Sequence, residues 1–360
     1  MARNNNRIFY AVHAVGIAKF ATTGVGDFKA ASGVQSVGIN TTFNLEQVFQ
    51  LGQIEIYENI ENIPDVEVTI EKVLDGATLI QHLATADATI GTLAGRYNNN
   101  RAMVNVAYYD DANSNASGVP LAQVHMSGMY VSSMSFSLPT DGNFTESCTL
   151  VGNDKTWSTG VAGDALPYNQ WGFGPASYTD SSAPAAASGV QRRENLVMSG
   201  CIFPTEIPGM TQHTVYGAGK GENVLSGDKH AVHMQSINVA TDLGRTELFE
   251  LGKRGPYHRF ADFPTEVTCS FEIVESELGD FIDAAAEGAN ITDQTIFLLC
   301  SDGTRLDLGT NNKLASISST GGETGGGNRT STYNYSNFNK LTVSSKLDVV
   351  QSLKTATNPT

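Results

Sequence analysis

Positive charge is scarce in this chain of 360 residues. Lysine and arginine number 22 against 37 aspartates and glutamates, so the formal net charge is −15. A protein that grips nucleic-acid phosphates needs the opposite balance, and the composition argues against that class. An acidic surface permits a different role, in which nucleic acid passes without sticking.

Cysteines are few, and long apolar runs are missing. No CxxC spacing occurs, which predicts free thiols in a reducing compartment and no disulfide framework. The four cysteines are Cys148, Cys201, Cys269 and Cys300. Arg7, His13 and Lys19 interrupt the N-terminal segment, which predicts neither a signal peptide nor a spanning helix there. We therefore expect assembly in a cytoplasm and no membrane insertion by the chain itself.

Motifs of enzymes and of ligand sites are missing as well. No Gly-x-Ser-x-Gly elbow occurs, and the glycine-rich stretches lack the Lys-Ser/Thr ending of a P-loop. His230 and His233 would lie on opposite faces of a strand, which disfavours a metal site. The sequence therefore predicts no enzyme activity, no catalytic or metal-binding residues and no cofactor.

Glycine, by contrast, is plentiful, with 36 residues, and threonine, serine and asparagine accompany it. Apolar residues make up 40% of the chain and charged residues 16%. This composition is typical of a folded, turn-rich protein in which β-structure dominates. The length allows two domains with cores of their own.

An internal repeat is the strongest pattern in the sequence. Residues 35–64 align without gaps on 235–264 with eight identities, where chance would give roughly two. The shared framework consists of Phe49, Leu51, Gly52, Tyr57 and Pro64 in the first copy and Phe249, Leu251, Gly252, Tyr257 and Pro264 in the second. A one-residue deletion then brings Glu67-Val68-Thr69 onto Glu266-Val267-Thr268. We expect the glycines to permit a sharp turn and the prolines to fix the return of the chain.

The same order of elements follows each aligned segment. Alternating strands lead into apolar residues at helical spacing, over 78–91 in the first copy and 278–289 in the second. Strands then return at 102–109, 128–138 and 146–152 in the first copy and at 294–300, 313–319 and 340–347 in the second. We predict a first unit at 1–157, a Gly/Ala/Ser/Pro-rich connection at 158–190, a second unit at 191–350 and a C-terminal tail at 351–360.

Two blocks of the first unit resemble tail tube proteins of tailed bacteriophages. They are "GVQSVGINTTFNLEQVFQLGQIEIYENIENIPDVEVTIEKVLDG" and "SGMYVSSMSFSLPTDGNFTESCTLVGNDKTW", and "QSINVATDLGRTELFELGKRGPYHRFADFPTEVT" in the second unit resembles the same family more faintly. The resemblance implies β-sandwich or barrel units, each with one flanking helix and a long projecting loop. It also implies that six units close into a ring and that rings stack into a tube for genome ejection.

Two units in one chain change the expected stoichiometry. Three chains would fill six positions and form a pseudo-hexameric trimer; the alternative is a ring of six chains that the second unit only decorates. Residues 1–157 carry 8 basic and 15 acidic residues and the remainder 14 and 22, so the two parts have similar net charges of −7 and −8. A tube lumen lined by such acidic units would repel DNA phosphates, so DNA would pass through without binding.

The projecting loops carry opposite charges in the two copies. Residues 53–63 hold Glu55, Glu58 and Glu61, whereas residues 253–263 hold Lys253, Arg254 and Arg259. One interpretation is two solvated loops whose charges have drifted, because exposed ion pairs contribute little. The other is that the acidic loop of one unit contacts the basic loop of another and sets their order around or between rings.

The resemblance thus predicts a structural virion protein of the tail, assembled in the host cytoplasm. Its expected partners are other copies of itself and the sheath, tape measure, baseplate and tail terminator proteins, while double-stranded DNA passes through without specific binding. Alternatives are a capsid decoration protein, a tail sheath protein, or the tube of a contractile injection or secretion system.

Overall fold

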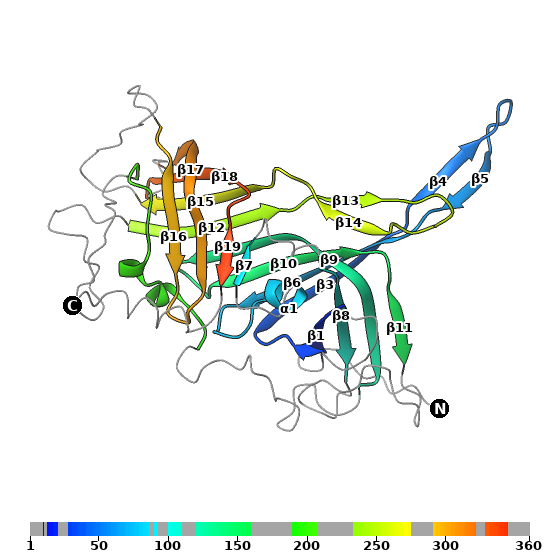
Figure 1. Ribbon diagram of the computed structural model, residues 1–360, viewed down its shortest axis with the longest axis horizontal. Coiled ribbons are helices and arrows are strands. Elements are labelled where there is room, and N and C mark those ends of the chain that lie inside the picture. The colour runs from blue at the N-terminus through cyan, green and yellow to red at the C-terminus, as the bar shows by residue number, and fades with distance from the viewer. Residues whose placement is uncertain are drawn as a thin grey trace.

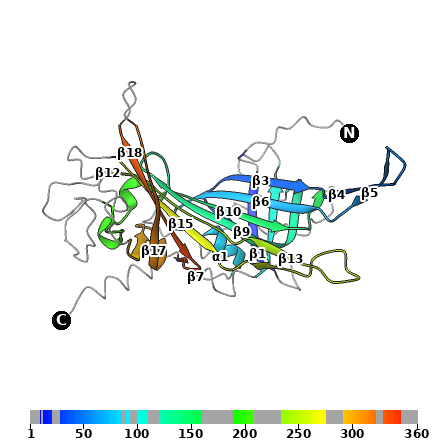
Figure 2. The same cartoon turned by 90° about the horizontal axis from the view of Figure 1, so that it is seen from above.

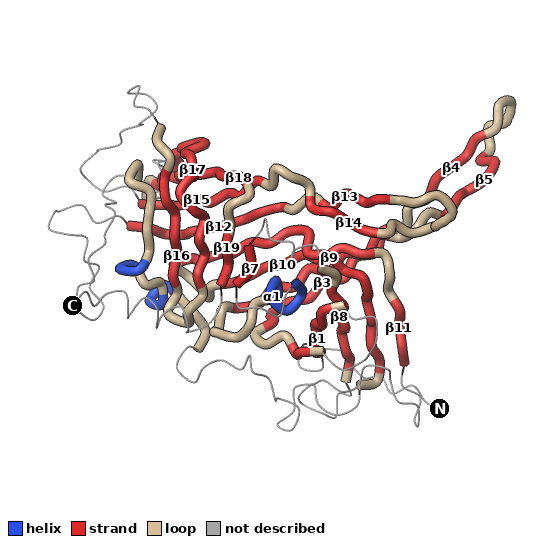
Figure 3. The backbone as a smooth tube through the Cα atoms, viewed as in Figure 1, coloured by secondary structure: helices blue, strands red, loops and turns tan. Residues whose placement is uncertain are grey.

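The computed structural model describes residues 10, 13–20, 28–85, 90–92, 100–109, 120–159, 189–207, 233–274, 291–321 and 328–344. Strands dominate these residues, and only one short α-helix and two 3-10 turns interrupt them (Figure 3). The predicted β-dominated fold is confirmed. Fifteen strands form one continuous network of pairings, and the remaining four form two separate hairpins.

The elements of the first half have the following bounds: β1 His13–Lys19, β2 Lys29–Ala30, β3 Val34–Thr42, β4 Leu45–Phe49, β5 Ile56–Glu61, β6 Asp65–Val73, α1 Ile80–Thr85, β7 Ile90–Thr92, β8 Ala102–Tyr108, β9 Ala122–Pro139, β10 Thr145–Gly152 and β11 Thr156–Thr159. Those of the second half are η3 Arg193–Asn195, η4 Met198–Gly200, β12 His233–Asp242, β13 Arg245–Leu248, β14 His258–Ala261, β15 Glu266–Val274, β16 Gln294–Leu299, β17 Arg305–Thr320, β18 Thr330–Phe338 and β19 Thr342–Ser344.

A central antiparallel sheet spans both halves of the chain. Its strand order is β3-β6-β10-β9-β12-β15-β18-β17, and the strands lie side by side in Figure 2. One face of the sheet is apolar and buried, with Val68, Phe136, Val239 and Phe271 among its fully covered residues. The alternation of apolar and polar residues along each strand produces this one-sided burial.

The long strand β9 belongs to two sheets. Its first part pairs with β8 and β11, its second part pairs with β10 and β12, and the strand bends between them (Figure 1). Gly128 lies at the bend with φ of 65°, in the left-handed region that suits glycine. β1, β8 and α1 cover the apolar face of the central sheet, and every residue of α1 is buried.

The pairings of the first half recur in the second half. β3 pairs with β6, β6 with β10 and β10 with β9, and likewise β12 pairs with β15, β15 with β18 and β18 with β17. The partners of β9 outside the central sheet, β8 and β11, correspond to β16 and β19, the partners of β17. Hairpin β4–β5 corresponds to hairpin β13–β14.

The strand register corrects the alignment that the sequence predicted beyond the prolines. Ile39 pairs with Val68, and its counterpart Val239 pairs with Cys269, so Val68 corresponds to Cys269 and not to Val267. The alignment based on the shared Glu-Val-Thr triplet therefore differs from the structural correspondence by two residues. Because side chains alternate with a period of two, this shift leaves the prediction of buried and exposed faces intact.

Other predicted elements differ from the structure in extent. The first helix is confirmed but is shorter, at Ile80–Thr85. The second predicted helix, at 278–289, and nearly all of the connection at 158–190 lie outside the described residues. The strand β18 was not predicted, because Thr332, Asn334 and Ser336 on one of its faces are polar and its only large buried side chains are Tyr333 and Tyr335. All four cysteines are free, as predicted, and all four are buried.

No helix among the described residues combines the length and the apolar character needed to cross a membrane.

His82 in α1 gives the fold a dependence on pH. Its Nε2 lies 3.1 Å from the carbonyl oxygen of Val343 in β19, so it links the two halves of the chain. Burial lowers the pKa of His82 to about 4, from 6.5 in an exposed histidine. Between pH 4 and pH 6.5 the unfolded chain therefore binds a proton at His82 that the folded chain does not bind.

We expect the free energy of unfolding to fall by about 3 kcal/mol through His82 as pH falls from 7 to 4. Urea unfolding at several pH values measures it, and His82→Gln should flatten the slope while His233→Gln, at an exposed site, should not. His13 and His125, whose pKa values burial also lowers, account for part of the remaining slope. An unchanged slope in His82→Gln would contradict the assignment.

Candidate assembly surfaces

Two hairpin arms leave the same end of the central sheet (Figure 1). Arm 1 is Leu45–Glu61, formed by β4 and β5, and arm 2 is Arg245–Ala261, formed by β13 and β14. Every residue of β5 is exposed. A hairpin of two strands is at best marginally stable in water, so arms of this kind need support from a packed surface.

The framework residues of the repeat form the same turn at the end of each arm. The backbone N–H of Gln53 donates to the backbone carbonyl oxygen of Gln50 over 3.2 Å. In the same way, the backbone N–H of Lys253 donates to the backbone carbonyl oxygen of Glu250 over 3.2 Å. Gly52 has φ of 90° and Gly252 has φ of 83°, as the third residue of a type II turn requires. The predicted role of the two glycines thus agrees with their geometry.

The turns present apolar side chains to solvent. Leu51 and Leu251 are fully exposed. The aromatic members of the framework are exposed as well: Phe49, Tyr57, Phe249 and Tyr257. Exposed apolar groups gathered on projecting arms are typical of a surface that another protein covers.

The framework prolines follow the arms, where the chain returns to the sheet. The carbonyl oxygen of Pro64 accepts a hydrogen bond from Asn153 Nδ2 over 3.1 Å, which ties this return to the end of β10. Pro264 lies in the segment before β15, and its peptide bond with Phe263 is cis.

Arg259 fastens arm 2 to the first unit. Its side chain is almost fully buried, and its Nη2 lies 2.8 Å from Asp65 Oδ1 and donates to Asn153 Oδ1 over 3.1 Å. Glu247, directly opposite on β13, also pairs with this guanidinium. In arm 1 the corresponding opposed residues are the neutral Gln47 and Asn59, so the charged clamp exists in arm 2 alone.

Two further residues hold arm 2 in place. Arg245 donates from Nε to the carbonyl oxygen of Val131 over 2.7 Å, and its guanidinium lies over the ring of Tyr130. The hydroxyl of Tyr130 lies 2.7 Å from Nδ1 of His258. Burial lowers the pKa of His258, and the nearby Arg101 and Arg245 lower it further. A neutral His258 is therefore available to share a hydrogen bond with Tyr130.

The six charged residues predicted to mediate contacts are only partly brought together. Arg254 Nη2 donates to the backbone carbonyl of Glu61 over 2.9 Å, so the two arms meet at this point. Lys253 pairs with Glu250 of its own arm. None of the ion pairs between described residues includes Glu55, Glu58 or Glu61. Contact between the acidic and basic loops of different chains stays a prediction.

Removal of the Arg259 clamp should weaken the joint between the units. Arg259→Leu leaves Asp65 and Glu247 without their cation, and we expect a loss of about 2 kcal/mol in the free energy of unfolding. This loss is below the range for a fully buried pair because Asp65 is about half exposed. Urea titration measures the loss, and Lys253→Leu, whose ion pair is exposed, should unfold like the wild type. Equal stability of Arg259→Leu and the wild type would contradict the clamp.

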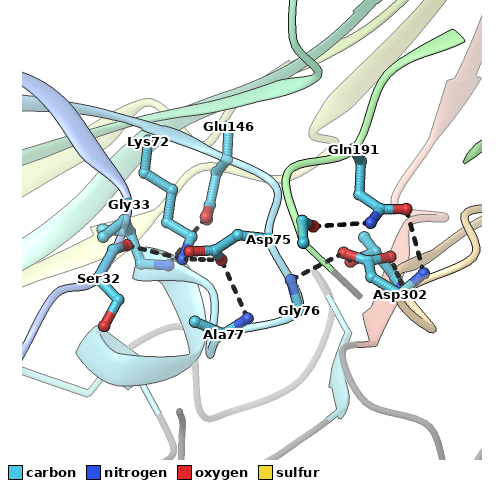
Figure 4. A network of polar contacts seen from close by, with 12 residues as sticks. Ser32, Gly33, Lys72, Asp75, Gly76, Ala77, Glu146, Gln191 and Asp302 are labelled. Carbon is cyan, nitrogen blue, oxygen red and sulfur yellow. Dashed lines mark hydrogen bonds and ion pairs between the residues drawn. The ribbon is translucent and has the colours of Figure 1, made fainter. Parts of the chain in front are cut away.

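A buried polar network lies beside the helix, in the turn between β6 and α1 (Figure 4). Lys72 is fully buried, and its Nζ donates to the carbonyl oxygen of Ser32 over 2.9 Å and lies 3.1 Å from Asp75 Oδ1. The carboxylate of Glu146 accepts the backbone N–H groups of Ile80 and Gln81 at the start of α1. Burial raises the pKa of Glu146, while these N–H groups and Lys72 act in the opposite direction.

This network reaches into the second unit. Asp302, in the turn between β16 and β17, accepts the N–H of Gly76 over 3.2 Å. Gln191 Oε1 accepts the N–H of Asp302 and the hydroxyl of Ser301, and the Gln191 N–H donates to the carbonyl oxygen of Leu74. The units are thus fixed to each other both beside the helix and at arm 2.

The central sheet has two open edges among the described strands. β3 pairs on one side only, with β6, and residues 313–320 of β17 pair on one side only, with β18. The internal joint between the units, by contrast, consists of β9 paired with β12. β12 corresponds to β3, and β9 corresponds to β17. The strands at the two open edges are therefore equivalent to the two strands that pair in the internal joint, but they are not paired with each other within one chain.

The second face of the central sheet is polar across both units. Toward its ends it also carries Tyr130, Val151, Lys313 and Phe338. Most of its other side chains are hydroxyls, amides and carboxylates, with two small residues between them. They are Ser36, Gly38, Asn40, Glu67, Thr69, Glu71, Ser133, Ser135, Ser137, Thr145, Ser147, Thr149, Ser236, Asn238, Ala240, Glu266, Thr268, Ser270, Glu272, Ser316, Ser318, Thr332, Asn334 and Ser336. We call these positions the open face.

The open face repeats one polar pair in both units. Ser36 Oγ donates to Glu71 over 3.2 Å, and its counterpart Ser236 donates to Glu272 over 3.0 Å. The alternation within β6 and within β15 predicts that their carboxylates lie opposite the buried residues, but the sequence could not tell that the two strands contribute to one face. Nor did it single out Asp65 or Tyr130 as contacts of arm 2, because both are distant in sequence from the arm. The internal repeat was the only signal that could have directed attention to them.

Matches to known proteins come from solved structures alone. No family model matches the chain, and no curated protein matches its sequence. Among solved structures, a chain of the cap that terminates the anti-feeding prophage tube is similar with a TM-score of 0.32 and 11% identity, over 44% of this chain and 96% of that chain. A chain of the anti-feeding prophage baseplate is similar with a TM-score of 0.31 and 10% identity, over 43% of this chain and 98% of that chain.

Proposed function

We propose that the chain is the subunit of a hollow tube in a phage tail or a tail-like particle. Three copies close into a ring of six similar units, and the rings stack. The protein acts as a conduit and performs no chemistry of its own. The residue-level resemblance to tail tube proteins motivates the identity, and the geometry of the sheet edges supports the mode of assembly.

The observation that carries the proposal is the complementarity of the two open edges. In the internal joint Ser135 pairs with Ala240 and Ser137 pairs with Asn238. Transfer of this register to the open edges pairs Ser318 of one copy with Asn40 of the next, and Thr320 with Gly38. An exposed strand edge is a template for pairing with another chain, so these edges favour closure among copies of this chain.

The open face is suited to line a bore. Hydroxyl and amide groups keep it wet, and Glu67, Glu71, Glu266 and Glu272 give it negative charge. Carboxylates repel DNA phosphates, whereas lysine or arginine would hold them through counterion release. Both arms project from one end of the sheet, where their exposed side chains are positioned to contact the neighbouring ring.

Assembly of the purified protein tests this function. We expect light scattering after size exclusion to give three times the 38.3 kDa chain mass, and electron micrographs to show hollow rods as concentration rises. A monomer that persists at the highest attainable concentration, without rings or rods, would refute the proposal.

A further inference from the structure

We propose that Glu58 in arm 1 of one copy pairs with Lys313 in β17 of the adjacent copy. The partner is a second copy of this chain, and the inference rests on the proposed ring. It names the charged contact at the joint between chains and gives the reason why the two arms differ in sign.

The internal joint supplies the geometry of this contact. There, arm 2 lies against the first unit, and His258 of the arm meets Tyr130 of β9 over 2.7 Å. His258 lies opposite Leu248, and Glu58 lies opposite Val48 at the equivalent place in arm 1. His258 therefore corresponds to Glu58.

The residue that corresponds to Tyr130 follows from the strand pairing. Val131 pairs with Leu150, and Leu314 pairs with Tyr335, the counterpart of Leu150. Both strands shift register immediately after these residues, at the same place. The residue before Val131 is Tyr130, and the residue before Leu314 is Lys313. The position of the Tyr130–His258 hydrogen bond inside the chain is therefore taken, between chains, by the ammonium group of Lys313 and the carboxylate of Glu58.

Both groups are accessible in the single chain. Every residue of β5, Glu58 included, is exposed, and the side chain of Lys313 is 61% exposed. Lys313 lies 3.5 Å from Asp293, which is also exposed. An ammonium group has three donors, so Lys313 can donate to Asp293 and to the carboxylate of Glu58 as well.

The two joints then differ in chemistry although they share a fold. Arm 2 brings cations to the first unit, where Arg259 meets Asp65. Arm 1 has neutral residues at the clamp positions and brings an anion to Lys313 of the second unit. An arm placed on the wrong unit would bring Arg245 and Arg259 of arm 2 toward Lys313, which like charges oppose.

Zero-length carbodiimide cross-linking of the assembled wild-type protein tests the contact directly. We expect mass spectrometry to find a peptide with Lys313 joined to a peptide with Glu58 in the trimer band, and to lose it after dilution to monomers. Lys313 joined to Asp293 alone, in rings that electron microscopy confirms, overturns the inference and leaves the proposed function standing. Absence of rings refutes both.

Charge reversal gives a second readout. Glu58→Lys and Lys313→Glu should each raise the concentration for half-maximal assembly about tenfold, and the double variant should restore it. Glu46→Lys makes the same charge change at another exposed position of arm 1 and should assemble like the wild type. Circular dichroism confirms that each variant is folded. Wild-type assembly by the single variants, or failure of the double variant to recover, overturns the pairing.

Discussion

Cysteines introduced by Asn40→Cys and Ser318→Cys in one chain are expected to join neighbouring chains under oxidising conditions. Non-reducing gels should show two-chain and three-chain products and nothing larger. The two positions belong to opposite edges of the central sheet, on the order of 30 Å apart, so a link inside one chain is out of reach. A disulfide needs Cα atoms within about 7 Å, so the product reports the register directly.

The internal joint provides the matched control for this experiment. Ser135 and Ala240 are paired in the structure, and Ser135→Cys with Ala240→Cys should link within one chain and leave the mass at that of a monomer. Gly38→Cys with Ser318→Cys, one pair out of register, should link far less. A control that links while the test pair does not would contradict the joint, and a ladder reaching six chains would contradict the trimer.

Lysines at two equivalent positions of the open face should convert the conduit into a DNA trap. Glu71→Lys with Glu272→Lys changes six carboxylates per three-chain ring into six ammonium groups. We expect wild-type rods to release linear duplex DNA at moderate salt and the variant to retain it, with affinity falling by about a thousandfold or more between 50 and 200 mM salt. Filter retention of labelled DNA at several salt concentrations measures the difference.

The control for this prediction places the same charge change away from the open face. Glu46→Lys with Glu194→Lys alters an arm residue and an exposed residue of η3. Its rods should release DNA as the wild type does. Equal retention by both variants would mean that net charge alone decides binding, and no retention by either would contradict the assignment of the open face to the bore.

The sequence was informative wherever a local pattern determines the structure. Strict alternation in β6 and β15 identified their buried faces, and the Phe-x-Leu-Gly spacing marked the turns at Gly52 and Gly252. It failed at β18, where Thr, Asn and Ser alternate with tyrosines and no aliphatic run signals a strand. The asparagines and serines, which favour turns, masked a strand that tertiary pairing on both sides stabilises.

Contacts between residues far apart in the sequence could not be predicted from sequence patterns. Arg259 was singled out for its charge, but its partners Asp65 and Asn153 lie 194 and 106 residues away in the chain. Lys72 and Glu146 were not noticed, because two buried charged residues that face each other on paired strands leave no periodic signal in the sequence. Such pairs follow from the register of distant strands, which only the fold determines.

A reconstruction of the assembled protein from electron micrographs would show how the chains are arranged in the ring. We expect six similar lobes with three-fold symmetry, in which β17 of each chain pairs with β3 of the next and the open face lines the bore. A ring of six chains related by strict six-fold symmetry, or a ring with the open face turned outward, would contradict this arrangement.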